Sequence, residues 1–205
     1  MPSSPEGEAR RGRLAWVALG VILALGSGGV SLLDAPRFDW QPGLALAEPW
    51  RAWSAAFVHF SGLHLAANLA GLALVVAYGW AGNLPLRSSL AWLLAWPLTH
   101  AALLLRPELL HYGGLSGVLH AGVAVAAVTL LTMPRQSRRW IGAATLLVVV
   151  IKVLLETPWG PTLRRPEGWD IAVAPFAHAA GLLVGTALAG AVALLAATRA
   201  RTRAP

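Results

Sequence analysis

The sequence contains no cysteine, and charged residues occupy only 12% of its 205 positions. Without cysteine the chain cannot form a disulfide, a thiol nucleophile or a cysteine-ligated metal site. With so few charges and 57% hydrophobic residues, its composition is not that of a soluble domain. The mean hydropathy of +0.62 favours a membrane protein.

Six apolar runs are long enough to cross a bilayer, which takes about 17 to 25 residues. The predicted spans are 14–33, 52–78, 88–105, 115–133, 140–155 and 171–197. We therefore expect an all-α polytopic membrane protein whose six transmembrane helices form one domain over 14–198. An N-terminal segment, 1–13, precedes this domain, and a basic tail, 199–205, follows it.

Basic residues are distributed unevenly between the two sides of these spans. Ten lie on one side: Arg10, Arg11, Arg13, Arg87, Arg135, Arg138, Arg139, Arg199, Arg201 and Arg203. Five lie on the other: Arg37, Arg51, Arg106, Arg164 and Arg165. Because cytoplasmic flanks collect arginine and lysine, we expect a protein of the cytoplasmic (inner) membrane with both termini in the cytoplasm. The first run is interpreted as a retained helix rather than a cleaved signal, because it is about twenty residues long.

The fourth predicted span opens with a serine flanked by glycines, in HYGGLSGVLH at 111–120. Gly114 and Gly117 leave room for a turn whose N–H groups point at a developing oxyanion, and they let a substrate carbonyl approach Ser116 without meeting a Cβ. The motif is not the Gly-x-Ser-x-Gly elbow of α/β-hydrolases, because position 118 is Val118. Ser116 is therefore a candidate nucleophile.

Two other spans carry polar residues that can meet this serine. The second, fourth and sixth spans run in the same direction, and His178 lies near the start of the sixth. His64 and Asn68 share one face of the second span, at positions i and i+4. We expect these residues to converge with Ser116, with His178 as the base.

Small residues provide a way to bring the fourth and sixth spans together. Gly181 and Gly185 form a small-xxx-small face one and two turns beyond His178, and such faces let helices approach closely. Gly117 and Ala121 have the same spacing on the partner span. This pairing predicts that His178 is pressed against the serine.

The acidic residues favour a two-residue site. No Asp or Glu is expected beside His178 within the membrane, so the sequence predicts a Ser-His dyad rather than a triad. Lys152 and Glu156 are one helical turn apart at the end of the fifth span. We interpret Lys152 as structural, either paired with Glu156 or extended toward the interface.

The motifs occur in a recognisable order: Trp50-Arg51, Phe57-Val58-His59, His64 to Asn68, Gly114 to Gly117, and Ala177-His178 to Gly185. This pattern resembles the rhomboid intramembrane serine proteases. It is most similar to the rhombosortase branch, in which GLSG is followed by a Leu-His pair, as Leu119-His120 is here.

The resemblance implies a rhomboid-like six-helix bundle with Ser116 as nucleophile and His178 as base. It implies an oxyanion hole made by His64, Asn68 and the Ser116 backbone N–H. It also implies a substrate: a single-span membrane protein, cut near the outer face, whose C-terminal tail consists of Gly-Gly, a hydrophobic helix and basic residues. The expected partners are therefore this substrate and the lipid bilayer, and the resemblance implies no cofactor.

His120 departs from the wider family, in which this position is usually aromatic and stacked on the catalytic histidine. We favour a packing and orienting role for His120, with hydrogen bonding to His178 or an influence on its titration as alternatives.

Other functions remain open on the sequence alone. A metalloprotease could use His59, His64, His120 and His178, but there is no His-Glu-x-x-His motif and no carboxylate near them in sequence. A silent rhomboid-like chaperone or adaptor is possible, although such relatives generally lack the serine or histidine. A transporter is disfavoured by the absence of matched halves, and no basic patch with interleaved aromatics supports a nucleic-acid partner. His59, His100 and His111 are as readily structural or interfacial as functional.

The predicted topology can be mapped on a chain that has no cysteine of its own. Single cysteines at Ala45 or Thr162 are expected to react with an impermeant thiol reagent added outside. Cysteines at Gly82, Gln136 or Thr202 should stay unlabelled, because these positions lie in the arginine-rich flanks that are predicted to be cytoplasmic. Labelling of the Gln136 position from outside would invert the predicted orientation.

Overall fold

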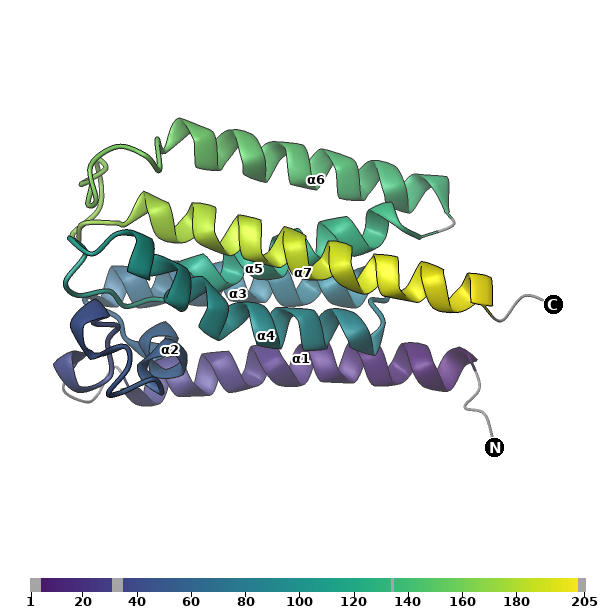
Figure 1. The fold of residues 1–205 in the computed structure, drawn as a ribbon, viewed down its shortest axis with the longest axis horizontal. Helices are drawn as coiled ribbons and strands as arrows, with labels where there is room; N and C mark the ends of the chain where they lie inside the picture. Colours follow the sequence, from purple (N-terminus) through teal and green to yellow (C-terminus); the bar gives the residue numbers. More distant parts are fainter. Residues whose placement is uncertain (1–4, 31–34, 134, 203–205) are drawn as a thin grey trace.

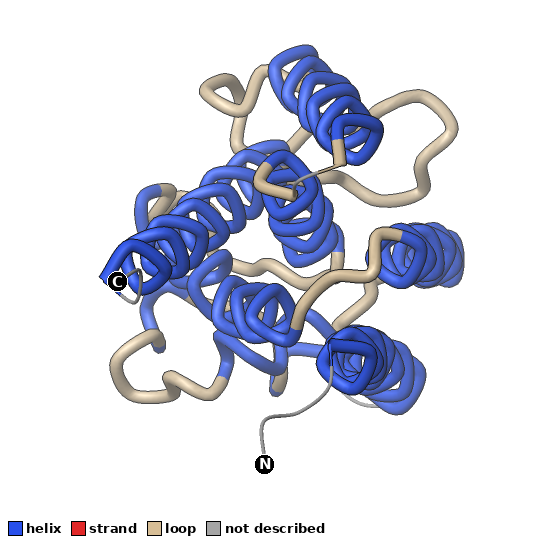
Figure 2. The backbone as a smooth tube through the Cα atoms, turned by 90° about the vertical axis from the view of Figure 1, so that its right-hand side faces the viewer, coloured by secondary structure: helices blue, strands red, loops and turns tan. Residues whose placement is uncertain are grey.

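The computed structural model describes residues 5–30, 35–133 and 135–202. Across these ranges the regular structure is helical, apart from two isolated β-bridges. The elements are α1 (Pro5–Val30), η1 (Ala35–Arg37), η2 (Pro42–Leu44), α2 (Arg51–Ser54), η3 (Ala55–Phe57), α3 (Gly62–Ala81), α4 (Leu86–Ala101), η4 (Ala102–Leu105), α5 (Ser116–Leu131), α6 (Gln136–Leu155) and α7 (Pro175–Thr202). The long helices lie side by side, with α1 and α6 at opposite edges of the bundle (Figures 1 and 2).

The predicted second span is wrong at its beginning. Residues 52–61 form the short helices α2 and η3 and a turn, and the long helix α3 begins only at Gly62. The reason is Ser61, whose extended backbone and side chain cap α3: its hydroxyl accepts a hydrogen bond from the His64 N–H at 3.0 Å. The sixth span likewise begins later than predicted, at Pro175, a residue suited to the first turn of a helix.

Within the described residues, four helices are long and apolar enough to cross a membrane. They cover Glu6–Val30, Gly62–Ala81, Leu86–Leu105 and Pro175–Arg199. The apolar helix α5 is shorter, and α6 carries Arg138, Arg139 and Lys152 within its twenty residues. The helical fold class is thus confirmed, whereas the count of six spans stays a prediction. Part of the first predicted span, 31–33, and residues 1–4 and 203–205 of the flanking segments lie outside the described residues.

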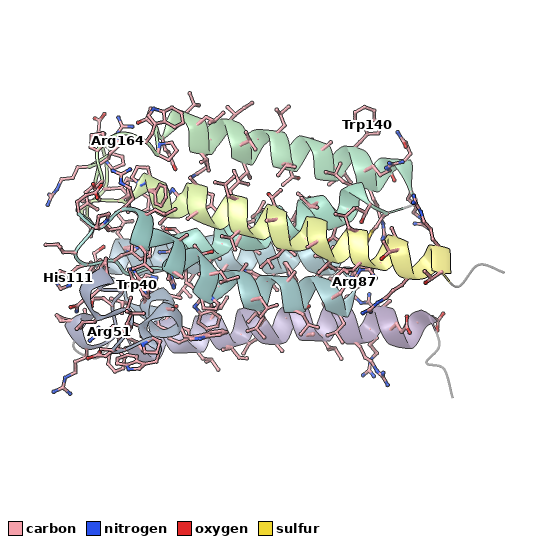
Figure 3. All side chains as sticks on the ribbon, viewed as in Figure 1. Trp40, Arg51, Arg87, His111, Trp140 and Arg164 are labelled. Atoms are coloured by element: carbon pink, nitrogen blue, oxygen red, sulfur yellow. The ribbon has the colours of Figure 1, made fainter. Side chains whose placement is uncertain are left out.

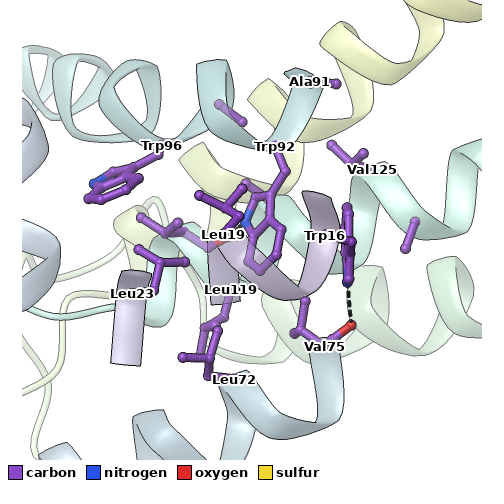
Figure 4. Packing of buried hydrophobic residues seen from close by; sticks show 14 of the residues in the cluster. Trp16, Leu19, Leu23, Leu72, Val75, Ala91, Trp92, Trp96, Leu119 and Val125 are labelled. Atoms are coloured by element: carbon purple, nitrogen blue, oxygen red, sulfur yellow. Dashed lines mark hydrogen bonds between the residues drawn. The ribbon is translucent and has the colours of Figure 1, made fainter. Parts of the chain in front are cut away.

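Two tryptophans tie the helices of the core together (Figure 4). The rings of Trp16 on α1 and Trp92 on α4 are fully buried, with centroids 4.4 Å apart. Trp16 donates its indole N–H to the Val75 carbonyl on α3 at 3.1 Å, and Trp92 donates to the Val118 carbonyl on α5 at 2.9 Å. Each large ring therefore contributes apolar burial while its single polar atom is satisfied, and α5 is anchored just after Ser116.

Among the described helices, α5 and α7 pack against each other most extensively, as the small residues predict. A Cβ on Gly181 would meet the backbone of Gly117 and Ala121. A Cβ on Gly185 would lie 2.5 Å from the Ala121 carbonyl oxygen and 2.8 Å from its Cα. The backbones touch directly, and this fixes the first turns of both helices relative to each other.

The two ends of the bundle differ in character (Figure 3). The short helix α2, which begins at Arg51, and the loops that contain Trp40, His111 and Arg164 gather at one end, which we call the loop-rich end. Arg87 and Trp140 lie at the other end, where α1 begins and α7 ends. Helices α3, α5 and α7 all start at the loop-rich end, so their first turns lie at a similar level.

The glycine contacts lead to a stability prediction with a control on the same helix. Gly185→Ala should lower the free energy of unfolding by about 1–3 kcal/mol, because its methyl group would force α7 away from backbone atoms that cannot yield. Gly190→Ala meets nothing within 4 Å and should be neutral or stabilising by roughly 0.5–1 kcal/mol. Thermal unfolding in detergent measures both, and equal melting temperatures for the two variants would contradict the close approach.

Candidate active site

The segment before Ser116 is held by backbone hydrogen bonds to the loop that follows α1. Trp40 and Tyr112 exchange two such bonds, at 2.7 and 3.0 Å, and the Gly114 N–H donates to the Ala55 carbonyl at 2.9 Å. Trp40 and Tyr112 are themselves buried. The segment that leads into Ser116 and α5 is therefore fixed in position by hydrogen bonds to residues that precede α3.

Gly114 brings this turn against α3. Its φ of +129° is one that residues with a side chain rarely adopt, and a Cβ would lie 2.8 Å from the His64 ring and 3.7 Å from the Asn68 side-chain nitrogen. His64 and Asn68 are both buried. Their side chains thus lie beside the start of α5, where the first N–H groups have no partner within the helix.

Ser116 and His178 are in hydrogen-bond contact. The Ser116 hydroxyl lies 2.9 Å from Nε2 of His178, a bond that joins the first turn of α5 to the first turn of α7. His178 is only 8% exposed. The serine hydroxyl thus lies next to a side chain that can act as its base. The two residues are held together because Gly181 and Gly185, one and two turns further along α7, pack against the backbone of α5.

A carboxylate also contacts His178, so the prediction that none lies beside it is wrong. Oε2 of Glu156 is 2.6 Å from His178 Nδ1. Glu156 caps the end of α6, and the loop that follows brings this cap next to the start of α7. The sequence shows only that Glu156 is one turn from Lys152. Nothing in the spacing connects it with a histidine 22 positions further along the chain.

His120 stacks on His178, with ring centroids 4.3 Å apart and planes inclined by 14°. It also makes two polar contacts: Nδ1 is 2.6 Å from the Ser116 carbonyl oxygen, and Nε2 is 3.1 Å from Nζ of Lys152. Lys152 in turn lies 2.6 Å from Oε1 of Glu156. The expected Lys152–Glu156 pair is therefore present, and it belongs to the same cluster as His178.

Three other histidines make local contacts. His100 is fully buried with Nδ1 2.6 Å from the Ala52 carbonyl, and His111 has Nδ1 2.7 Å from Oδ2 of Asp39. His59 lies in the loop before α3, 4.8 Å from the His64 ring between centroids, and burial lowers the pKa of its imidazole. Of these three, His59 lies against the His64 ring, and His111 lines a small pocket together with His64 and Ser116.

A cavity of about 750 Å³ opens at this cluster, with α3 on one side and α6 on the other. Its polar wall includes His64, Asn68, Ser116, His120, Lys152, Glu156 and His178. The remainder is largely apolar, with Leu74, Val75, Leu119, Val123 and Val149 among its lining residues. A mostly apolar pocket with a few convergent polar groups is the usual form of a ligand site.

These contacts fit nucleophilic chemistry better than metal binding. A serine hydroxyl beside an imidazole, with N–H donors nearby, is the arrangement used for acyl transfer. Within the described residues, no group of three or more His, Cys, Asp or Glu side chains is placed to hold a metal ion. His59, His64, His120 and His178 therefore do not form the ligand set considered from the sequence.

Comparison with known proteins identifies the domain. A family model described as "Rhomboid domain" matches residues 46–194, which include every residue of the cluster. No curated protein matches the sequence well enough to count as a relative.

The ionisation of Glu156 gives a test of its contacts. Burial disfavours the charged carboxylate, but hydrogen bonds from His178 and Lys152 and their charges outweigh burial and lower its pKa from 4.5 to about 2. A lowered folded-state pKa contributes stability that is present above pH 4.5 and is lost as the pH falls toward 2. Wild type should therefore melt at a higher temperature than Glu156→Gln at neutral pH, and the difference should shrink in acid. A pH-independent difference would show that the charge of Glu156 does not stabilise the fold.

Proposed function

The chain belongs to the rhomboid family of intramembrane proteases, and on that basis we propose that it is a serine endopeptidase that cleaves membrane-protein substrates. The observation that carries the proposal is the 2.9 Å contact between the Ser116 hydroxyl and His178 Nε2, at the polar wall of an otherwise apolar cavity. Rhomboids without activity exist, so a competent pair of nucleophile and base is the feature that favours an enzyme here.

The proposed reaction begins with attack of Ser116 on a peptide carbonyl. His178 takes the hydroxyl proton at Nε2 as the serine oxygen bonds to the carbonyl carbon. The proton then passes to the nitrogen of the leaving peptide, and an ester remains on Ser116. Water hydrolyses the ester with the same histidine as base, which returns the serine and releases the second product.

The oxyanion of each tetrahedral intermediate needs donors. We assign these to the Asn68 side-chain amide, the His64 imidazole and the Ser116 backbone N–H. Support comes from the burial of His64 and Asn68, from their place on the cavity wall, and from their closeness to Gly114. A side chain at position 114 would occupy the space in front of the His64 ring.

The substrate is proposed from the rhombosortase-like motif: a secreted or surface protein with a C-terminal Gly-Gly, a hydrophobic helix and a basic tail. The apolar part of the cavity suits a hydrophobic segment, and glycines suit a cleft next to a buried serine. In this proposal the loop-rich end faces outward from the inner membrane and both termini are cytoplasmic, in keeping with the arginines at the opposite end.

Substitution of the two reacting residues tests the proposal. Ser116→Ala and His178→Ala should each abolish cleavage of a co-expressed reporter that carries the three-part tail, with membrane insertion unchanged. Ser137→Ala, an exposed serine at the far end of the bundle, should cleave like wild type. A fluorophosphonate probe should label wild type at Ser116 only.

Two results would replace the proposal with another function. Chelator-sensitive cleavage that persists in Ser116→Ala would favour a metalloprotease. Failure of wild type both to cleave the reporter and to react with the probe would favour an adaptor without catalytic activity.

A further inference from the structure

Glu156 is held in place by contacts outside the proposed reacting pair. The Arg164 guanidinium donates to the Glu156 carbonyl at 3.0 Å and to the Thr157 hydroxyl at 2.8 Å. The backbone of Arg164 also exchanges hydrogen bonds with Val173, at 2.9 and 2.8 Å, two residues before α7 begins. One residue therefore fastens the end of α6 to the start of the helix that carries His178.

The partners of His178 determine which of its nitrogens carries the proton. A carboxylate accepts hydrogen bonds and donates none, so His178 Nδ1, at 2.6 Å from Glu156, must carry a proton. In the neutral imidazole Nε2 then has a free lone pair, and this is the nitrogen 2.9 Å from the Ser116 hydroxyl. Glu156 thus selects the one tautomer in which His178 can accept the serine proton.

The same reasoning fixes His120. A lysine ammonium only donates, so His120 Nε2, 3.1 Å from Lys152, must accept. Its Nδ1 then carries the proton and donates to the Ser116 carbonyl at 2.6 Å. A protonated His120 would set a second N–H donor against the ammonium, so Lys152 keeps this ring neutral.

These bonds close into a ring that begins and ends at Ser116. The hydroxyl donates to His178, which donates to Glu156; Lys152 donates to Glu156 and to His120; and His120 donates to the carbonyl of the serine. Each hydrogen bond of the ring pairs a donor with an acceptor, from the buried His178 to the partly exposed Lys152.

We propose that Glu156 positions the catalytic base His178, and that Lys152 fixes Glu156 and His120 relative to each other by donating a hydrogen bond to each. The site then works as a Ser-His-Glu arrangement whose ring of hydrogen bonds is completed by Lys152. The proposal rests on the proposed function. When His178 takes the serine proton it becomes a cation next to the Glu156 carboxylate, which stays ionised throughout and receives no proton. Lys152 balances that carboxylate while the imidazole is neutral.

The two charges act on His178 in opposite directions. Removing the Glu156 charge disfavours the imidazolium, whereas removing the Lys152 charge favours it. The other titratable groups around His178 are His120 on α5 and His64 on α3, and neither is changed by these substitutions. The acidic limb of the pH profile should therefore move to lower pH in Glu156→Gln and to higher pH in Lys152→Met.

The test measures how fast the purified full-length protein in detergent reacts with a fluorophosphonate probe, because this reports serine activation whatever the natural substrate. Glu156→Ala should lower the maximal rate of labelling by about 100-fold or more with little change in probe binding, as for carboxylates that orient a catalytic histidine. Glu156→Gln offers an amide N–H donor that can select the other tautomer of His178, so its labelling should also be slow. Glu108→Gln removes an exposed carboxylate of another loop, paired with Arg106, and should label at the wild-type rate.

The outcomes separate this proposal from the one on which it rests. No labelling of wild-type Ser116 would overturn the proposed function itself. Labelling of wild type with unchanged rates in both Glu156 variants would overturn only the positioning role. Reduced labelling with the acidic limb moving the same way in Glu156→Gln and Lys152→Met would also overturn it, in favour of a structural role.

Discussion

The contact of α5 with α7 is the constraint on which the site depends. The two backbones touch because positions 117, 181 and 185 are glycine and position 121 is alanine, and a methyl group at position 181 or 185 would collide with main-chain atoms of α5. A serine and a histidine at the first turns of two such helices have little freedom to separate. The hydrogen bond between Ser116 and His178 is therefore a result of packing far more than of loop conformation.

Much of the arrangement follows from local sequence patterns. The apolar runs predict the long helices, and the four-residue spacings place His64 with Asn68 and Gly181 with Gly185 on shared faces. These features depend on helical periodicity, which neighbouring residues determine. The beginning of α3 was harder to predict, because the apolar composition of 52–58 hides a change to short helices ended by the Ser61 cap.

Glu156 shows what such patterns omit. Its contact with His178 depends on the path of the 157–174 loop and on the hydrogen bonds that Arg164 makes across it. No periodicity joins the end of one helix to the start of the next through an irregular segment. The sequence predicts the contact of Glu156 with Lys152, which uses Oε1. It does not predict the contact of Oε2 with His178. The resting cluster carries one positive and one negative charge, so it adds no net charge to an apolar bundle.

The apolar part of the cavity has a consequence for handling the protein in solution. Its lining includes Leu74, whose side chain is largely exposed, so the cavity is continuous with the outer surface between α3 and α6. A detergent alkyl chain is chemically similar to the hydrophobic segment that the cavity suits. We therefore expect detergent alkyl chains to enter the cavity, so that affinities measured in micelles reflect competition between detergent and substrate.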